Sequence, residues 1–198
     1  MPITLVRARS EVDAKDRAAF EGLMRKTHRQ AYGFAFRLTG NGAEAEDLVQ
    51  ETYLRAFRFF YRYDAGMPFT NWIYRIMSNA HVDALRRRSR LRTSSLEQAG
   101  ADGSTAWELP DLLASPDRPM LESLLDEPLQ KAMNGMTAEF RTAVVLADLE
   151  GLAYDEIAET MGTSVGTVRS RIHRGRKQLR NHLLRNYPAE YGGLADEL

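Results

Sequence analysis

The sequence predicts an all-α protein in which two small helical domains are joined by a flexible acidic linker. Apolar residues recur with a period of 3.6 in both the first and the last parts of the 198-residue chain. Residues 93–119 keep no such period and are rich in Gly, Ser, Ala, Asp and Pro. We therefore place the first domain at 1–92, the linker at 93–119 and the second domain at 120–198.

The formal net charge of zero conceals a strong partition of charge along the chain. Residues 1–92 contain 17 Lys and Arg against 10 Asp and Glu, whereas residues 93–128 contain one Arg against eight acids. Residues 129–198 contain nine of each sign. Neutrality is therefore an average over a basic N-terminal part, an acidic middle and a C-terminal part whose positive charge is concentrated on one helix. The acidity of the linker argues against DNA contact there.

Several classes of site are not expected from this sequence. The chain contains no cysteine, which excludes disulfides, thiolate metal sites and thiol redox switches within it. We find no Gly-rich phosphate loop, no nucleophile elbow and no histidines at metal-ligand spacing. We therefore expect no catalytic residue, cofactor, metal or small-molecule substrate. The lack of a signal peptide and of an apolar run of about 18 residues predicts a cytoplasmic protein without membrane insertion.

Two helices are expected to begin the first domain. The first spans 16–38 and stops before Gly40, and the second runs through 43–63 after Asn41. The early turns of the second helix hold four acids, Glu44, Glu46, Asp47 and Glu51. Acids there are favoured by the helix dipole, and an exposed acidic face also suits a basic or polar partner surface. The residues alone leave both interpretations open.

A loop at 64–68 precedes a third helix, 71–90, for which Thr70 is the expected cap. Trp72 falls on the buried stripe of this helix. The outer face is expected to carry groups that can stack on an unpaired base or hydrogen-bond it: Tyr74, Arg75, Ser78, Asn79, His81 and Asp83. The helix ends in a cluster suited to a nucleic-acid backbone: Arg86, Arg87, Arg88, Arg90 and Arg92.

In the second domain, helix formation resumes at 120–133, where Pro128 marks a break or a new first turn. Thr137 is expected to cap the next helix, which Gly151 terminates. This helix leads directly into the most distinctive stretch of the chain.

Two amphipathic helices separated by a turn of about three residues predict a helix-turn-helix at 151–184. Gly162 suits the left-handed residue that ends the first helix, and Thr163 or Ser164 can cap the second. The second helix carries seven cations and no acid: Arg169, Arg171, Arg174, Arg176, Lys177, Arg180 and Arg185. Such a helix also fits a membrane surface or an acidic partner. The acidic first helix and the short turn favour DNA.

Three blocks of the chain resemble, in order, the extracytoplasmic-function group of bacterial sigma factors, which give RNA polymerase its promoter specificity. The core-binding segment of that family resembles AEAEDLVQETYLRAF, and its −10 recognition segment resembles FTNWIYRIMSNAHVDALRRRSR. Its −35 domain resembles EFRTAVVLADLEGLAYDEIAETMGTSVGTVRSRIHRGRKQLR. The chain departs from the family pattern at Ala153, where a capping Ser is common, and the tail after Leu184 fits no block.

The resemblance implies roles for three surfaces. Core RNA polymerase would be bound by Asp47, Gln50 and Glu51. The −10 element would be bound by Tyr63, Asp64, Asn79, Asp83, Arg86, Arg87 and Arg88, with a flipped base captured beside Asn79 and phosphates held by the arginines. The −35 element would be bound by Arg169, Ser170, Arg171, His173, Arg174, Arg176 and Lys177. The acidic linker would thread through the polymerase near its active cleft.

The resemblance also implies a function: a sigma factor that directs RNA polymerase to specific promoters in a stress or envelope response, under the control of an anti-sigma factor. The alternative is an autonomous helix-turn-helix regulator that binds a palindromic site as a dimer without polymerase. An enzyme acting on nucleic acid needs a metal or a general base, and the acids at 44–51 sit amid nothing that binds a phosphate. We therefore expect no enzyme, and we expect core polymerase, promoter DNA and an anti-sigma factor as partners.

Overall fold

The computed structural model describes residues 3–93 and 126–195, and within these ranges every regular element is a helix. This confirms the all-α prediction. Residues 94–125, which hold the predicted linker and the predicted start of the next helix, lie outside the described residues.

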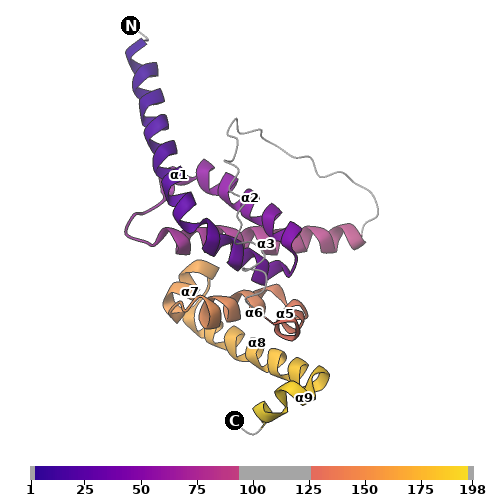
Figure 1. Ribbon diagram of the computed structural model, residues 1–198. Coiled ribbons are helices and arrows are strands. Elements are labelled where there is room, and N and C mark those ends of the chain that lie inside the picture. Colours follow the sequence, from indigo (N-terminus) through magenta and orange to yellow (C-terminus); the bar gives the residue numbers. More distant parts are fainter. Residues whose placement is uncertain (1–2, 94–125, 196–198) are drawn as a thin grey trace.

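Three long helices form the N-terminal domain: α1 (Ile3–Thr39), α2 (Gly42–Arg58) and α3 (Phe69–Thr93). They pack around a fully buried core that includes Phe20, Phe34, Val49, Tyr53, Ile73 and Met77. α1 begins well before the predicted residue 16, and its first turns project from the body of the protein (Figure 1).

α2 ends earlier than the predicted helix 43–63. A three-residue 3-10 turn, η1 (Phe60–Arg62), follows it. The ring of Phe60 packs edge-on against the buried ring of Phe20, with centroids 5.2 Å apart. The helix therefore ends before Phe60, and the tighter 3-10 turn holds the Phe60 ring against the core.

The predicted cap of α3 was wrong. α3 begins at Phe69, and the backbone N–H groups of Asn71 and Trp72 donate to the carbonyl oxygen of Pro68 at 3.0 and 3.3 Å. Thr70 therefore lies inside the first turn, where it cannot act as the flanking residue. Pro68 takes that place because a helix boundary commonly falls at a proline.

The C-terminal domain contains α5 (Glu127–Asn134), α6 (Ala138–Val144), the π turn η2 (Val145–Leu149), α7 (Tyr154–Met161), α8 (Val165–Asn186), α9 (Pro188–Tyr191) and η3 (Gly192–Ala195). Pro128 lies in the first turn of α5, as predicted, and Asp126 caps that helix by accepting the N–H of Leu129 at 3.1 Å. Thr137 occupies the position before α6 but makes no capping hydrogen bond with its side chain.

α7 and α8 form the predicted helix-turn-helix. Gly162, with φ of +58°, ends α7 in the left-handed conformation, and the hydroxyl of Ser164 accepts the N–H of Thr167 at 3.1 Å at the start of α8. α8 approaches α6 closely because Gly175 has no side chain. A Cβ atom there would lie 2.6 Å from Val144, so this contact requires glycine.

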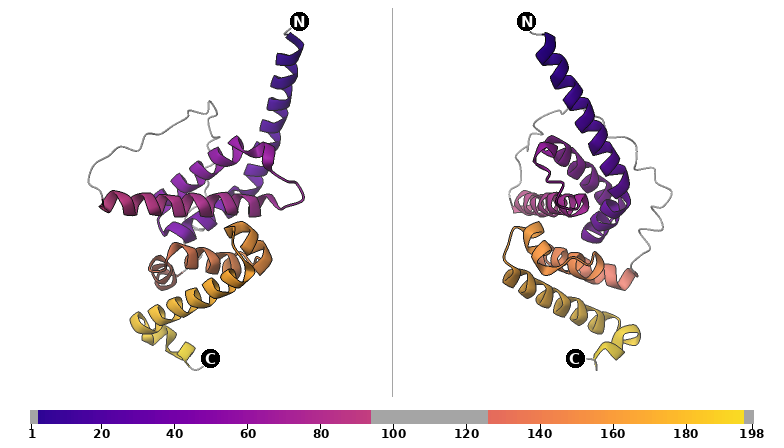
Figure 2. Two further views of the ribbon diagram at one scale, coloured as in Figure 1. Left: turned by 180° about the vertical axis from the view of Figure 1, so that it is seen from behind. Right: turned by 90° about the vertical axis from the view of Figure 1, so that its left-hand side faces the viewer.

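The two domains pack directly against each other, an arrangement that the sequence left open. α1 and α3 contact the C-terminal domain through α5, α6 and α7, and the buried apolar side chains of both domains form one continuous core. Figures 1 and 2 show the C-terminal domain under α1 and α3, with α2 turned away from it and α8 on its far side. The prediction of two helical domains is confirmed, and their contact decides which predicted surfaces are accessible.

Candidate nucleic-acid interface

α8 presents a cationic face to solvent. Its apolar side packs into the C-terminal domain through Val168, Ile172, Gly175 and Leu183. The opposite side exposes five of the predicted DNA-binding residues: Arg169, Ser170, His173, Arg174 and Lys177. Because α8 lies on the far side of the domain, this face points away from the N-terminal domain (Figure 2). It offers long cationic and hydrogen-bonding side chains to phosphates and base edges.

Of the two other predicted DNA-binding residues of α8, Arg176 has a partner within the protein and Arg171 lines a cavity between the domains. Arg176 binds Asp148 of η2 in a bidentate ion pair, with Nε 3.0 Å from Oδ2. Arg171 is half-buried and lines a cavity of about 150 Å³ together with Asn79 and Asp83 of α3. This cavity has walls from both domains, so it joins residues predicted to read two separate DNA elements.

The outer face of α3 contains both exposed and buried positions. Asn79 and Asp83 are exposed, whereas Tyr74, Ser78 and His81 are buried, which corrects the prediction that these three lie on an outer face. Neighbours from both domains bury them: Tyr74 packs on α1, Ser78 lines a cavity with residues of α6, and His81 lines the groove between α2 and α3. Burial lowers the pKa of His81 to about 4, so the imidazole is neutral near pH 7. Of the predicted outer-face residues, α3 therefore exposes only Arg75, Asn79 and Asp83.

Tyr74 belongs to a polar cluster that joins the domains. Its ring packs on Phe34 with centroids 4.3 Å apart, and its hydroxyl donates to Oε2 of Glu150 at 2.5 Å. The other oxygen of Glu150 binds Arg37 of α1 in an ion pair whose side chains are only 18% and 11% exposed. Burial and the charge of Glu150 raise the pKa of Tyr74, which keeps its hydroxyl protonated as the donor.

Arg141 of α6 is a second link between the domains. It is 8% exposed, and its guanidinium donates to the carbonyl oxygen of Leu38 at the end of α1. It also donates to the carbonyl oxygens of Asn134 and Met136, at 2.9 and 3.3 Å. The reasoning from sequence missed this residue. The sequence did offer a signal, because Arg141 is the only cation on a short helix of mostly apolar residues. An arginine buried in such a place requires hydrogen-bond acceptors from neighbouring segments.

The loop after Tyr63 has a defined shape and lies beside α7. The Tyr63 hydroxyl donates to the carbonyl oxygen of Met67 at 2.8 Å, and Asp64 accepts a backbone N–H two residues further on at 2.9 Å. Residues 66–68 share a cavity of about 220 Å³ with Glu156 and Glu159 of α7. The loop predicted to capture a DNA strand therefore faces carboxylates in this structure.

Asp47, Gln50 and Glu51 lie on the exposed face of α2, away from the C-terminal domain. The side chain of Asn41 caps this helix by accepting the N–H of residue 44 at 3.1 Å. Asp47 and Glu51 lie beyond the first turn, where the dipole effect fades, and capping therefore does not account for them. Glu51 makes a pair with Arg55 at 2.6 Å on the same helix and remains 49% exposed.

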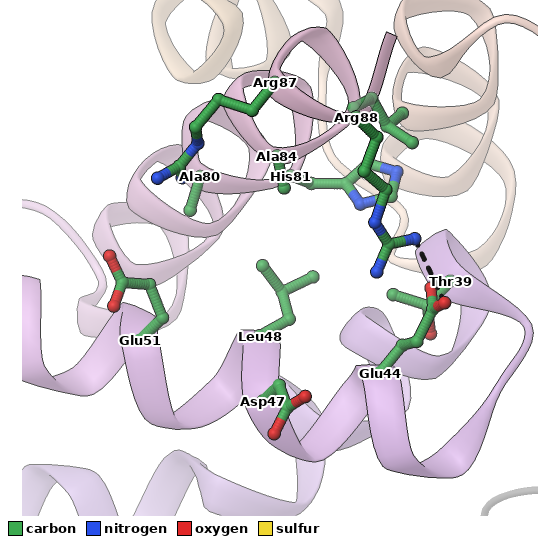
Figure 3. Close-up of a pocket in the computed structure, with 11 residues that line it drawn as sticks. Thr39, Glu44, Asp47, Leu48, Glu51, Ala80, His81, Ala84, Arg87 and Arg88 are labelled. Carbon is green, nitrogen blue, oxygen red and sulfur yellow. Dashed lines mark hydrogen bonds and ion pairs between the residues drawn. The ribbon is translucent and has the colours of Figure 1, made fainter. Parts of the chain in front are cut away.

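A groove separates the acidic face of α2 from the arginine cluster at the end of α3. Figure 3 shows this groove, a cavity of about 180 Å³ with Leu48 in its floor. Arg88 reaches across it to Glu44 with 3.0 Å between nitrogen and oxygen, and Arg87 lies exposed on its rim. The backbone of Arg86 belongs to α3, and its side chain is outside the described residues.

In the part of the chain that the structure describes, no helix has both the length and the apolar character that a membrane span requires. No group of three or more acidic or histidine side chains in that part is arranged to hold a metal ion.

Two protein-family models match the chain in the same order as the two domains. Sigma-70 region 2 matches residues 23–91, which cover most of the N-terminal domain. Sigma-70 region 4 matches residues 126–179, from the cap of α5 into α8.

Curated proteins and solved structures give the same result. The ECF RNA polymerase sigma factor SigE of Mycolicibacterium smegmatis is 42% identical over 168 residues, which are 85% of this chain and 63% of SigE. The chain thus spans less than two thirds of that relative. SigW of Bacillus subtilis, also an ECF RNA polymerase sigma factor, is 31% identical over 87% of this chain and 93% of its own length. The sigma factor RpoE of Bartonella quintana, solved in complex with the anti-sigma factor NepR, has a TM-score of 0.62 at 25% identity over 83% of this chain and 96% of its own.

Proposed function

This chain belongs to the extracytoplasmic-function (ECF) RNA polymerase sigma factors, and we propose that it binds core RNA polymerase and directs it to a specific set of promoters. The observation that carries the proposal is the ordered pair of matches to regions 2 and 4, each coinciding with one helical domain. An autonomous dimeric regulator is not favoured, because its N-terminal domain would need no resemblance to a polymerase-binding region.

We assign core polymerase binding to Asp47, Gln50 and Glu51. All three are exposed on α2, and Asp47 and Glu51 are not needed to cap that helix. A row of carboxylates and an amide suits a basic and polar surface on the partner, where charge complementarity accelerates and orients docking.

We assign −10 recognition to the loop at Tyr63 and Asp64 and to Asn79 and Asp83 on α3. Asn79 and Asp83 are exposed amide and carboxylate groups that can hydrogen-bond the edge of an unpaired base. The arginines at 86–88 follow in the sequence of the same helix, and guanidinium groups suit the phosphates of the captured strand.

We assign −35 recognition to α8. Exposure on one solvent-facing side of this helix supports the assignment for Arg169, Ser170, His173, Arg174 and Lys177. Arg171 and Arg176 remain part of the proposed surface, but Arg176 must first leave Asp148, and Arg171 lines a cavity against the N-terminal domain.

The proposed role also implies whether the protein is an enzyme and where in the cell it works. A sigma factor contributes specificity while polymerase performs the chemistry, so we propose a non-enzymatic protein that works in the cytoplasm with the transcribing polymerase. Since the RpoE relative was captured with an anti-sigma factor, we also propose control of this chain by such an inhibitor, with release in a stress or envelope response.

The function is tested by reconstituting transcription from purified components. Core polymerase with this chain should produce discrete transcripts from a library of genomic promoters, and core polymerase alone should not. Binding of the isolated chain to a palindromic duplex as a dimer, without any gain of transcription on adding core polymerase, would support the autonomous regulator instead.

A further inference from the structure

We propose that Arg55 of α2 is a positioning residue that connects the polymerase surface with the −10 surface. The polymerase surface here means Asp47, Gln50 and Glu51, and the −10 surface means Tyr63, Asp64, Asn79 and Asp83. Arg55 contacts one residue of each, Glu51 and Asp83. The proposal rests on the function proposed above and deepens it, because it names the side chain through which docking on Glu51 favours capture of a DNA strand at Asp83.

The guanidinium of Arg55 lies between two carboxylates. Its Nε is 2.6 Å from Oε1 of Glu51, one helical turn earlier on α2, and its Nη1 is 3.9 Å from Oδ2 of Asp83 on the neighbouring helix α3. The first distance is that of a charge-assisted hydrogen bond, whereas the second is too long for one. Because Nε and Nη1 are separate donors, one guanidinium can serve both acids. Arg55 is thus bonded to Glu51 and has room to move closer to Asp83.

All three side chains are accessible to partners. Their exposed fractions are 31% for Arg55, 49% for Glu51 and 52% for Asp83. Ion pairs that are exposed to this extent add little to the stability of a fold, because water competes for both charges. An exchange of partners at Arg55 therefore costs little. A basic side chain of polymerase can take Glu51, and the guanidinium can then close on Asp83.

The exchange changes the charge next to the captured strand. Asp83 is negative, and so is each phosphate of the strand, which makes their approach unfavourable. A guanidinium bonded to Asp83 offsets that repulsion. It also holds one carboxylate oxygen in place and leaves the other to accept a hydrogen bond from the edge of a base. Asp83 follows Asn79 by one helical turn, so this effect acts beside the residue proposed to bind the flipped base.

A purely structural role for Arg55 is the alternative. Arg55 lies in the last turn of α2, where the helix dipole favours a cation. Arg58 lies in the same turn and supplies a cation there as well. The helix dipole also requires no carboxylate on another helix. The contact with Asp83 is therefore the feature that the structural role leaves unexplained, and it is the feature to test.

A double-mutant cycle between Arg55 and Asp83 tests the connection. Holoenzymes are assembled with the wild-type chain, Arg55→Gln, Asp83→Asn and the double variant. Each is titrated into a fluorescent single-stranded oligonucleotide that carries the −10 element of a promoter found by the reconstitution. Both substitutions remove a charge and keep a polar side chain of similar length. The matched control is Arg17→Gln, which breaks an exposed Arg–Glu pair of the same spacing within α1.

We expect Arg55→Gln to weaken binding of the strand about fivefold, the upper range for an exposed ion pair, and to have no further effect in the Asp83→Asn background. Arg55→Lys keeps the charge and should remain within about twofold of wild type. Arg55→Gln should bind core polymerase no more weakly than wild type, because Glu51 loses a competing partner within its own helix. Arg17→Gln should change neither affinity.

Three results would overturn the proposal. Unchanged strand binding by Arg55→Gln would mean that Asp83 does not depend on Arg55. An equal loss in the wild-type and Asp83→Asn backgrounds would mean that Arg55 contacts the DNA itself. A lower melting temperature of Arg55→Gln together with weaker core binding would mean that Arg55 stabilises α2. Failure of the proposed function is distinguishable, because the wild-type chain would then give no promoter-dependent transcript with core polymerase.

Discussion

Arg141 in α6 donates a hydrogen bond to the carbonyl oxygen of Leu38 at the end of α1, and so places a buried cation between the two domains. The last carbonyls of a helix have no partner within it, and the guanidinium supplies one from a different domain. Burial lowers the pKa of Arg141, but an arginine remains charged at any physiological pH. The cation is stable there because its donors reach several carbonyl oxygens at once.

Removal of this cation should destabilise the whole chain. Arg141→Met keeps much of the side-chain volume but leaves the carbonyl oxygens of Leu38 and Met136, which are buried, and of Asn134, which is partly buried, without this donor. We expect a loss of about 2–4 kcal/mol in the free energy of unfolding, measured by urea titration with circular dichroism. Arg174→Met, at an exposed position of α8, should change it by less than about 0.5 kcal/mol. Equal effects would show that the interface does not depend on Arg141.

Reversal of charge on α2 should abolish polymerase binding without unfolding. Asp47→Arg or Glu51→Arg changes an exposed side chain on a helix whose opposite side is buried. Core association, measured by co-elution, should be lost while the thermal melt is retained. Glu127→Arg, an exposed acid of α5, should bind core polymerase as wild type. A collapsed melt for the α2 variants would mean that these acids stabilise the fold.

Variants of the two proposed DNA surfaces, α8 and α3, should have different effects in a promoter assay. Arg169→Ala or Arg174→Ala should weaken binding of the holoenzyme to closed duplex by about 1–3 kcal/mol for a base contact. Asn79→Ala should leave duplex binding nearly unchanged but impair open-complex formation, because the base edge that it would bind is paired in duplex. A pre-opened bubble should rescue only part of that defect. Equal loss of duplex affinity for Asn79→Ala and Arg169→Ala would exclude strand capture by α3.

The ion pair between Arg176 and Asp148 should weaken the contact of α8 with DNA. Asp148→Asn removes the competing carboxylate and frees the guanidinium for a phosphate. We expect tighter binding of the holoenzyme to −35 duplex and a salt dependence steeper by about 0.9 in the slope of log K against log salt, the increment for one phosphate contact. Weaker binding of Asp148→Asn would indicate instead that Asp148 holds Arg176 in the orientation that DNA requires.

The burial of His81 predicts a loss of stability in mild acid. Its pKa in the folded protein, about 4, lies below the unfolded value of 6.5, chiefly because of burial and next because of Arg141. The unfolded chain therefore binds more protons between these values, and the free energy of unfolding falls as the pH drops through that window. His28, whose pKa burial also lowers, acts in the same direction. The total effect of His81 is at most about 3 kcal/mol.

Unfolding measured at about pH 7 and about pH 5 checks this expectation. The difference between the two values should be smaller in His81→Gln than in wild type, whatever the stability of the variant at pH 7. His173→Gln, at an exposed position of α8, is the control and should keep the wild-type difference. An unchanged difference in His81→Gln would show that this imidazole is not the titrating group.

The features that were predicted correctly from the sequence depend on interactions between residues close together in the chain. Gly162 and Ser164 end and begin helices through backbone geometry and a hydrogen bond three residues away, so their roles are visible in the sequence. Thr70 shows the limit of this reasoning. A hydroxyl before a helix is a frequent cap, but Pro68 had already fixed the boundary one residue before α3.

The larger errors lie on α3 and have one cause. Tyr74, Ser78 and His81 are polar or amphipathic and fall outside the apolar stripe, so helical periodicity assigns them to solvent. They are buried because segments distant in the sequence lie against them, as α1 does for Tyr74 and α2 for His81. A polar residue can be buried where such a segment supplies a partner, as Glu150 does for Tyr74.

By itself, the sequence determined that this chain is helical, that it divides into two domains, that α8 is a cationic recognition helix and that the family is that of the ECF sigma factors. Those properties follow from periodicity, local capping and ordered motifs, which act over a few residues. Only the tertiary structure decided that the domains close on each other, that Arg141 and Glu150 join them, and that Asn79 shares a cavity with Arg171 while Asp47 remains exposed. These features depend on contacts between residues about a hundred positions apart, such as Arg37 with Glu150, and such contacts leave no period in the sequence.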